Sequence, residues 1–239
     1  MKTMKLFAAV SASALAGVAA PVAADVVTLN FEGIATSYPN DSNVGVLGFY
    51  NGGASSAGTT GTYYGVSFGV SAIAFCLNTL GATCSNVSRG GLGDPNSQRG
   101  GLWFRNDAQA FLNYSGGFTT GFSFYYSAIE EGGTIDVFDQ PNGTGNILWR
   151  LTLPTTSSAC SGFNASFCPF VAAGVAFQGT AMSIGFGGAA RTVVFDDLTF
   201  GSATPGGAVP EPATWAMLIM GFGAIGGTLR RRSARIAFA

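Results

Sequence analysis

An alternation of apolar and polar side chains runs through the middle of the chain and predicts β-strands rather than helices. Residues 118–126 show it most clearly, because Phe or Tyr occupies four of the five even-numbered positions. A period of two places successive side chains on opposite faces of a strand. Other runs rich in Val, Ile, Thr and aromatic residues predict further strands at 26–32, 64–70, 134–138, 147–153, 182–186 and 192–200.

Clusters of Gly and Asn separate these runs and indicate turns. Asn142-Gly143, directly after Pro141, predicts a tight hairpin turn between two of the strands. No amphipathic stretch of ten residues predicts a helix in this region. We therefore expect roughly eight to ten short strands and an all-β fold, an antiparallel β-sandwich of the jelly-roll type. Residues 35–61, rich in Gly, Ser and Asn, are expected to form an extended loop region.

The N-terminus has the pattern of a secretory signal peptide. Lys2 and Lys5 precede an uncharged apolar stretch at 6–18, and Val22-Ala23-Ala24 places small side chains at the −3 and −1 positions. We expect a signal-peptide helix within residues 1–24 and cleavage before Asp25. The alternative is a buried N-terminal helix, which Pro21 disfavours.

The C-terminus combines a short motif, an apolar span and a basic cluster. Pro210-Glu211-Pro212 precedes an uncharged run at 213–229, which contains Trp215 near its start and ends at Arg230, Arg231 and Arg232. The 17 residues of this run are at the lower limit for a bilayer-spanning helix. A single transmembrane helix is predicted, with the basic tail 230–235 in the cytoplasm and residues 25–209 outside the membrane.

This order of motif, span and basic end, over residues 209–235, resembles the PEP-CTERM sorting signal in its PEPxxWA form. The resemblance implies an exported protein of a Gram-negative bacterium that makes exopolysaccharide. It also implies an inner-membrane precursor, cleaved near Pro210-Glu211-Pro212 by an exosortase, a membrane-embedded cysteine protease. The mature protein would then reach the cell surface or the extracellular matrix. Residues 203–208 are expected to link the signal to the ectodomain.

The ectodomain, assigned to residues 25–202, is acidic. Between Asp25 and Val209 there are five arginines, eleven acidic side chains and no lysine, a net charge of −6. Such a domain is a poor nucleic-acid binder, because phosphates are bound by clustered basic side chains. The chain contains no His, which excludes Ser-His-Asp and Cys-His triads and His-ligated zinc or haem.

The four cysteines form two pairs of equal spacing, Cys76 with Cys84 and Cys160 with Cys168. An even number of cysteines in an exported chain indicates disulfides, and pairing within each C-x7-C segment is the simplest of three connectivities. A redox pair would favour C-x-x-C spacing. We therefore expect two structural disulfides, Cys76–Cys84 and Cys160–Cys168.

The ectodomain further resembles the jelly-roll, carbohydrate-binding-module-like ectodomains that often precede this sorting signal. Across about 26–201, the resemblance is carried by Asn30–Gly33, Gly121–Tyr126, Val137–Asp139, Gly143–Gly145 and Val194–Phe200. It implies that the first and last strands lie close together, and that an acid from each end holds a calcium ion.

Glu32, Asp196 and Asp197 are the candidate calcium ligands, and Asp41 or Asn43 could add oxygens. On a regularly alternating strand, Asp196 would share a face with Leu198 and Phe200 and would be buried. A buried carboxylate must be paired, bound to metal or hydrogen-bonded. The alternative to calcium is therefore that Asp196 only accepts backbone hydrogen bonds and that Glu32 is a solvated edge residue.

The sequence also allows two other kinds of site, a glycosidase active site and a sugar-binding platform. A glycosidase requires two carboxylates that flank the scissile bond, and the candidates are Glu130, Glu131, Asp136 and Asp139. Adjacent acids before Gly132-Gly133 are typical of a solvated turn, which disfavours catalysis. A sugar-binding platform requires exposed aromatic and planar polar groups, and the candidates are Trp103, Arg105, Asn106, Tyr114, Tyr50, Tyr63 and Tyr64. Most of the 20 Phe, 7 Tyr and 3 Trp must instead fill the core.

We therefore expect a non-catalytic exported β-sandwich with a cleavable sorting tail. The expected partners are an exosortase and, transiently, the inner membrane, with extracellular polysaccharide as a further candidate. Trp215 and the apolar run would dock in the membrane, and the arginines at 230–232 would fix the orientation. A calcium-dependent carbohydrate-binding module is the second hypothesis, and a glycoside hydrolase is the third.

Overall fold

The computed structural model describes residues 26–35, 44–76, 99–128, 131–156, 170–206 and 220–222. Residues 220–222 are helical, and the other described residues belong to one compact unit, Ala24–Val209. The described part of this unit contains strands and one 3₁₀ turn, so the predicted all-β fold is correct. No helix in the described ranges is long and apolar enough to cross a membrane, and most of the predicted span 213–229 lies outside them.

Twelve strands are present in the described residues, and their bounds are β1 Val27–Leu29, β2 Val44–Gly45, β3 Val66–Phe68, β4 Ala72–Cys76, β5 Gly100–Phe104, β6 Phe111–Phe118, β7 Gly121–Ala128, β8 Gly133–Gln140, β9 Thr144–Leu153, β10 Val171–Ala176, β11 Ala181–Gly187 and β12 Val193–Phe200. The 3₁₀ turn η1 (Asp107–Gln109) lies between β5 and β6. The seven predicted runs all fall on strands. The alternation did not indicate β2, β4, β5 or β10, which are short or rich in Gly and Ala, and it indicated only the last residue of β6.

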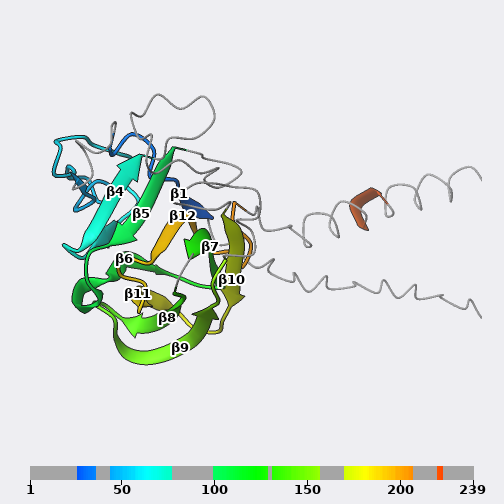
Figure 1. Cartoon of the computed structure of the whole chain (residues 1–239). Coiled ribbons are helices and arrows are strands. Elements are labelled where there is room, and N and C mark those ends of the chain that lie inside the picture. Colours follow the sequence, from blue (N-terminus) through cyan, green and yellow to red (C-terminus); the bar gives the residue numbers. More distant parts are fainter. Residues whose placement is uncertain are drawn as a thin grey trace, which may run out of the picture. The chain divides into compact units, whose positions relative to one another are not determined.

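The strands form two antiparallel sheets that enclose a common core (Figure 1). The seven-stranded sheet has the order β10-β7-β12-β5-β4-β2, with β1 also paired to β12, and the five-stranded sheet has the order β3-β6-β11-β8-β9. Val27 lies opposite Phe200 and Leu29 opposite Leu198, which confirms that the first and last strands are neighbours. The chain passes repeatedly from one sheet to the other, and two of these crossings are the β6–β7 turn and the β10–β11 turn.

Aromatic rings from both sheets fill the core. The ring centroid of Phe200 lies 4.9 Å from that of Phe118, 5.3 Å from that of Phe122 and 5.1 Å from that of Tyr114. Most of these pairs are tilted or edge-to-face, the arrangements that aromatic quadrupoles favour. Burial of such side chains stabilises the fold by about 1.5–3 kcal/mol each. Most of the aromatic side chains in the described residues lie in or against this core.

The alternating run 118–126 is not one strand. Phe118 ends β6 in the five-stranded sheet and Gly121 begins β7 in the other sheet, so a two-residue turn separates them. Thr120 has φ +73°, in the left-handed region that tight turns use. Phe118 and Phe122 therefore reach the same core from opposite sheets. The predicted hairpin turn at Asn142-Gly143 is confirmed, because both residues have positive φ, as a type I′ turn requires.

The last strand departs from regular alternation. Asp196 lies opposite Tyr125, whereas Thr199 lies opposite Ser123, so β12 contains one extra residue there. Asp197 has φ +47° at this β-bulge. The predicted sharing of a face by Asp196, Leu198 and Phe200 is therefore wrong, because the bulge reverses the alternation. Asp196 is fully buried all the same, since the outer face of this sheet is also covered.

Candidate functional site

A groove lies at one side of the sandwich, between β9, an edge strand of the five-stranded sheet, and the end of β10, an edge strand of the seven-stranded sheet. Its volume is about 720 Å³. One wall is Leu148 and Trp149 of β9, the edge strand of the five-stranded sheet. The rest comes from Thr119 and Thr120 of the β6–β7 turn and from residues 176–180, which join β10 to β11. Three segments far apart in the sequence thus build one concave surface.

Trp149 is the largest side chain of the groove and is 47% exposed. Its neighbour Leu148 also lines the groove, although adjacent strand residues normally point to opposite faces. Trp149 lies opposite Val137 and Ile147 lies opposite Phe138, so Leu148 is the extra residue of a β-bulge. Because the register from Trp149 to Leu153 is regular, the bulge brings Leu148 to the same side as Trp149, toward the groove.

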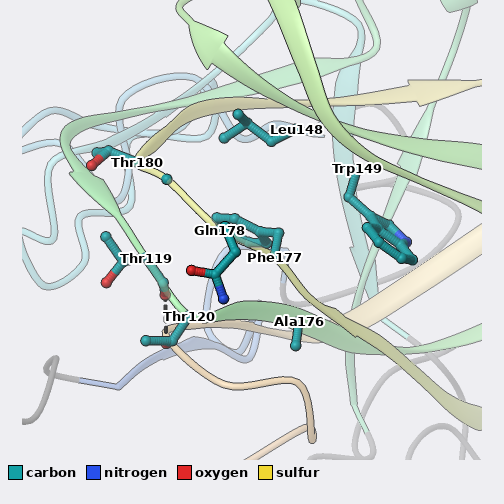
Figure 2. A pocket seen from close by; sticks show the side chains of 9 residues that line it. Thr119, Thr120, Leu148, Trp149, Ala176, Phe177, Gln178 and Thr180 are labelled. Carbon is teal, nitrogen blue, oxygen red and sulfur yellow. Dashed lines mark hydrogen bonds between the residues drawn. The ribbon is translucent and has the colours of Figure 1, made fainter.

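The floor is apolar and the rim is polar. Phe177 is buried and packs edge-to-face on Phe118, with ring centroids 5.6 Å apart. Figure 2 shows Phe177 and Gln178 in the centre, with Leu148 above them, Trp149 at one end, and Thr119 and Thr180 at the other. None of the lining residues is charged. The groove therefore offers one large aromatic face together with hydroxyl and amide groups.

The candidate calcium ligand Glu32 is not a solvated edge residue. Its carboxylate oxygen Oε1 accepts the backbone N–H groups of Arg99 and Gly100 at 3.1 and 2.9 Å. These bonds attach the turn after β1 to the start of β5. The side chain of Glu32 therefore has a structural role at this edge of the core.

Asp196 and Asp197 are both buried in β12. The Oδ1 atom of Asp196 accepts the N–H of Asp197 at 2.7 Å. The carboxylates of Asp196 and Glu32 also act on Tyr50: burial chiefly raises the pKa of the Tyr50 phenol, and both negative charges raise it further. The described residues contain no group of three acidic or cysteine side chains arranged to hold a metal ion. Asp41 and Asn43 lie outside these residues, so the calcium site stays a prediction.

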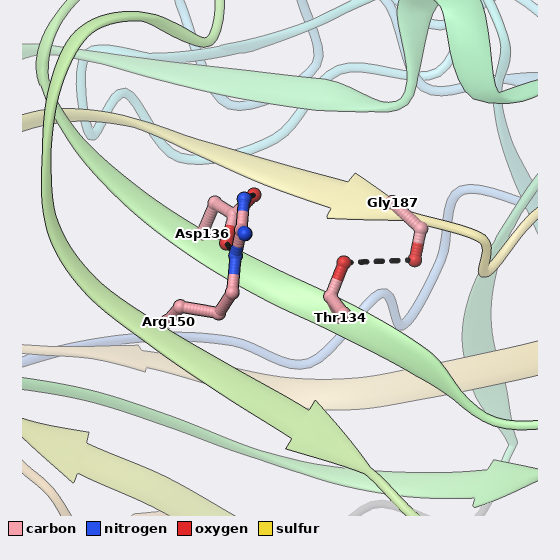
Figure 3. A network of polar contacts seen from close by, with 4 residues as sticks. All are labelled: Thr134, Asp136, Arg150 and Gly187. Atoms are coloured by element: carbon pink, nitrogen blue, oxygen red, sulfur yellow. Dashed lines mark hydrogen bonds and ion pairs between the residues drawn. The ribbon is translucent and has the colours of Figure 1, made fainter.

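The candidate glycosidase acids are engaged elsewhere or exposed. Asp136 binds Arg150 through two bonds, Nε to Oδ1 at 2.6 Å and Nη2 to Oδ2 at 2.8 Å (Figure 3). Hydrogen bonds from the side chain and backbone of Asn146 lower the pKa of the Asp139 carboxyl. Glu131 is exposed, and Glu130 lies outside the described residues. The described acids are therefore not gathered around a cleft.

Most of the predicted platform aromatics pack inside the protein. Tyr50 is buried, Tyr64 and Tyr114 pack against the core, and Trp103 packs against Phe170 and Val194 on the outer face of the seven-stranded sheet. Arg105 accepts a hydrogen bond from the Arg191 side chain through its backbone carbonyl, and Asn106 precedes η1. Tyr63 is exposed at 67% but does not line the groove.

Trp149 was not among the residues predicted for a binding site. In regular alternation, Trp149 shares a face with Leu151 and Leu153 and would belong to the core. The available signal was the run Ile147-Leu148-Trp149, since three consecutive large apolar residues do not fit a strand with one solvated face.

Only one of the four cysteines, Cys76, lies in the described residues. Cys76, the last residue of β4, is disulfide-bonded. The other three cysteines lie outside the described residues, so the pairings Cys76–Cys84 and Cys160–Cys168 stay predictions.

The residues predicted for sorting lie outside the described part of the chain, but their pattern can be compared with known families. Residues 208–232 match the family model of the PEP-CTERM protein-sorting motif. The chain carries a PEP-CTERM sorting motif. This motif marks an exported protein that is anchored transiently in the membrane before it is processed. No curated protein matches the chain.

Several solved structures are similar to parts of the chain. A family 6 carbohydrate-binding module, studied for its binding sub-sites, is 22% identical; the match covers 45% of this chain and 77% of the module, with a TM-score of 0.31. The C-terminal family 6 module of a laminarinase from Zobellia galactanivorans is 10% identical, with coverages of 44% and 82% and a TM-score of 0.30. A module of Cellvibrio mixtus lichenase 5A, solved with cellotriose, is 8% identical, with coverages of 46% and 82% and a TM-score of 0.27.

Proposed function

We propose that this protein is a non-catalytic surface or extracellular-matrix protein whose sandwich binds an extracellular polysaccharide in the groove beside Trp149. The observation that carries the proposal is the half-exposed Trp149 ring at a groove whose lining residues are all uncharged. Sugar rings present apolar C–H faces that stack on such a ring, and hydroxyl groups that bond to polar rims. Thr119, Thr180 and Gln178 supply the polar rim.

The uncharged lining favours a neutral polysaccharide over an anionic one. Trp149 and Leu148 are carried by a strand, and strands hold side chains more rigidly than loops do. A preformed surface loses little conformational entropy when it binds a ligand. A non-catalytic role is supported by the candidate glycosidase acids. Asp136 is bound by Arg150, and Asp139 accepts hydrogen bonds from Asn146.

The tail gives the route by which the protein would reach that polysaccharide. An exosortase would cleave near Pro210-Glu211-Pro212, while Trp215 and the arginines at 230–232 hold the precursor in the inner membrane. The released sandwich would then stay at the cell surface or in the extracellular matrix. The two disulfides Cys76–Cys84 and Cys160–Cys168 would stabilise it there.

The test is affinity electrophoresis of the mature protein through gels that contain neutral or anionic polysaccharides. We expect retardation by at least one neutral polymer and a loss of affinity of about tenfold in W149A, equivalent to about 1.4 kcal/mol. Y63A is the matched control, because it removes an exposed aromatic ring outside the groove. Unchanged retardation of W149A, or equal losses in both variants, would rule out the groove.

A calcium requirement is the second candidate function. It is supported by the burial of Asp196 and Asp197 beside the end of β1, where Glu32 is fixed by two backbone N–H groups. The same gels run with calcium and with a chelator test it. A calcium-dependent affinity that D196N abolishes would support the calcium site, whereas equal affinity in both buffers would exclude a calcium-dependent mechanism.

A further inference from the structure

The chain does not leave the sandwich directly after β12 but turns back over the outer face of the seven-stranded sheet. Gly201 donates its N–H to the carbonyl oxygen of Gly121 at 2.9 Å, and its own carbonyl oxygen accepts the Thr120 hydroxyl at 2.6 Å. The carbonyl oxygen of Ser202 accepts the hydroxyl of Ser123 at 2.9 Å. The first two residues after the strand are therefore fixed to β7 and to the turn that precedes it.

The far end of this segment is fixed as well. Gly206 donates its N–H to the hydroxyl oxygen of Thr199 at 3.0 Å. Thr199 is fully buried, and its hydroxyl also donates to the carbonyl of Asp197 at 2.9 Å. We call residues 201–206 the tether, since they lead from β12 toward the sorting motif that begins at residue 208. Both ends of the tether are hydrogen-bonded to the sandwich.

The sheet is shaped to receive the tether. Gly174 of β10 lies opposite Ser123 of β7, and a Cβ atom at Gly174 would overlap the carbonyl oxygen of Ala203 and lie 2.6 Å from the Cβ atom of Ser123. A Cβ atom at Gly121 would lie 2.6 Å from the backbone nitrogen of Ala203. Larger side chains at these two glycines would therefore push the tether away from the sheet. The tether packs directly on the backbone of two neighbouring strands.

Only three residues, 207–209, lie between the tether and Pro210 in the sequence. The four residue steps from Gly206 to Pro210 span at most about 14 Å when fully extended. The radius of gyration of a folded domain of this size is about 16 Å. The radius of the folded domain therefore exceeds the length of chain between the domain and Pro210. A membrane-embedded protease that cleaves there must approach the domain closely. Release of the tether would add six residues, or about 20 Å of reach.

We propose that the sandwich holds the tether in this seat in order to keep the sorting motif close to the folded domain, and that this closeness limits the rate of processing. The proposal depends on the sorting motif but not on the groove. A free tether gives the protease more room at Pro210, so processing becomes faster when the tether is released or lengthened. The seat thereby makes the folded sandwich a determinant of its own processing.

The first test measures the seat itself by hydrogen–deuterium exchange of the full chain. We expect G174A to raise exchange in the peptide that covers residues 201–206 by at least tenfold while the other β7 peptides stay protected. S123A removes the hydroxyl that binds Ser202 and should raise exchange in the same peptide. The matched control is S127A, on the same strand, whose buried hydroxyl has no hydrogen-bond partner in the described part of the chain. Equal exchange in wild type and G174A would refute the seat.

The second test measures processing in cells that cleave the motif, by pulse–chase conversion of precursor to mature protein. Ten Gly and Ser residues inserted after Gly206 lengthen the free chain without touching the seat. The same insertion after Gly58, in an exposed turn, is the control. We expect conversion at least threefold faster with the insertion after Gly206 and with G174A, and a wild-type rate in the control and in S127A. A wild-type or slower rate with both lengthened tethers would overturn the proposal.

Discussion

The hydroxyl oxygen of Tyr50 accepts the backbone N–H of Phe31 at 2.9 Å in the interior of the sandwich. Both residues are buried, and their rings also meet edge-to-face with centroids 5.8 Å apart. Phe31 follows β1, whereas Tyr50 belongs to the loop between β2 and β3. One buried hydroxyl thus attaches a long loop to the first strand.

Removal of this hydroxyl leaves a buried N–H group without its acceptor. We expect Y50F to lower the free energy of unfolding by about 1–3 kcal/mol. Urea unfolding of the mature protein measures this change. Y63F makes the same chemical change on an exposed side chain and should stay within about 0.5 kcal/mol of wild type. Equal stability of Y50F and wild type would contradict the role assigned to this bond.

Tyr50 also predicts a loss of stability in alkali. Burial raises the pKa of its phenol, and the charges of Asp196 and Glu32 add to this effect. The unfolded chain gives up the phenol proton at pH values near 10, where the folded protein still holds it. The protonated phenol of Tyr50 therefore makes its full contribution to the free energy of unfolding below about pH 10. This contribution decreases as the pH rises further. Unfolding free energies between pH 9 and 11 should fall more steeply for wild type than for Y50F, and parallel curves would speak against this explanation.

The ion pair of Asp136 and Arg150 joins β8 to β9, the strand that also carries Trp149. The Asp136 carboxylate raises the pKa of the Arg150 guanidinium, which is 57% exposed. Exposed pairs contribute little, so we expect D136N to lower the free energy of unfolding only slightly at low salt. The coupling energy from a double-mutant cycle with R150Q should decrease at 1 M salt. A coupling that does not respond to salt would show that the pair acts through packing instead.

Reduction of the disulfides should lower the melting temperature of the mature protein. Each predicted bond closes a short loop and stabilises the fold by about 2–3 kcal/mol on the chain-entropy model. Melting curves of C76S and C160S, recorded with and without a reductant, separate the two bonds. An unchanged melting temperature in C160S would mean that Cys160 does not contribute a stabilising bond.

The alternation of side chains located the longer strands well, because one face of each strand packs on the core. It failed where a single residue interrupts the period. The bulge at Asp197 reverses the faces of β12, and the bulge at Leu148 brings that side chain beside Trp149 at the groove. The extra residue of each bulge leaves no signal in the amino-acid composition of its strand. The position of each bulge depends instead on the pairing with a neighbouring strand that is distant in sequence. The turn at Thr119-Thr120 was hidden for a similar reason, since two polar residues continue the period across it.

The acidic candidates illustrate a second limit. Glu32, in the turn after β1, and Asp196, within β12, were proposed as ligands of one calcium site, and β1 does pair with β12. Which atoms they contact could not be predicted, because the partners of Glu32 are backbone N–H groups that precede β5. Backbone partners leave no trace in the identity of side chains.

The two turns that flank the groove both cross from one sheet to the other. The distance between its walls is therefore tied to the spacing of the sheets, which is about 10 Å in sandwiches and is set by the side chains packed between them. A substitution such as Phe118 to a smaller residue would let the layers settle closer together and narrow the cleft without altering any of its own surface. Divergent versions of this domain could in this way adjust their fit to different polymers through the thickness of the interior.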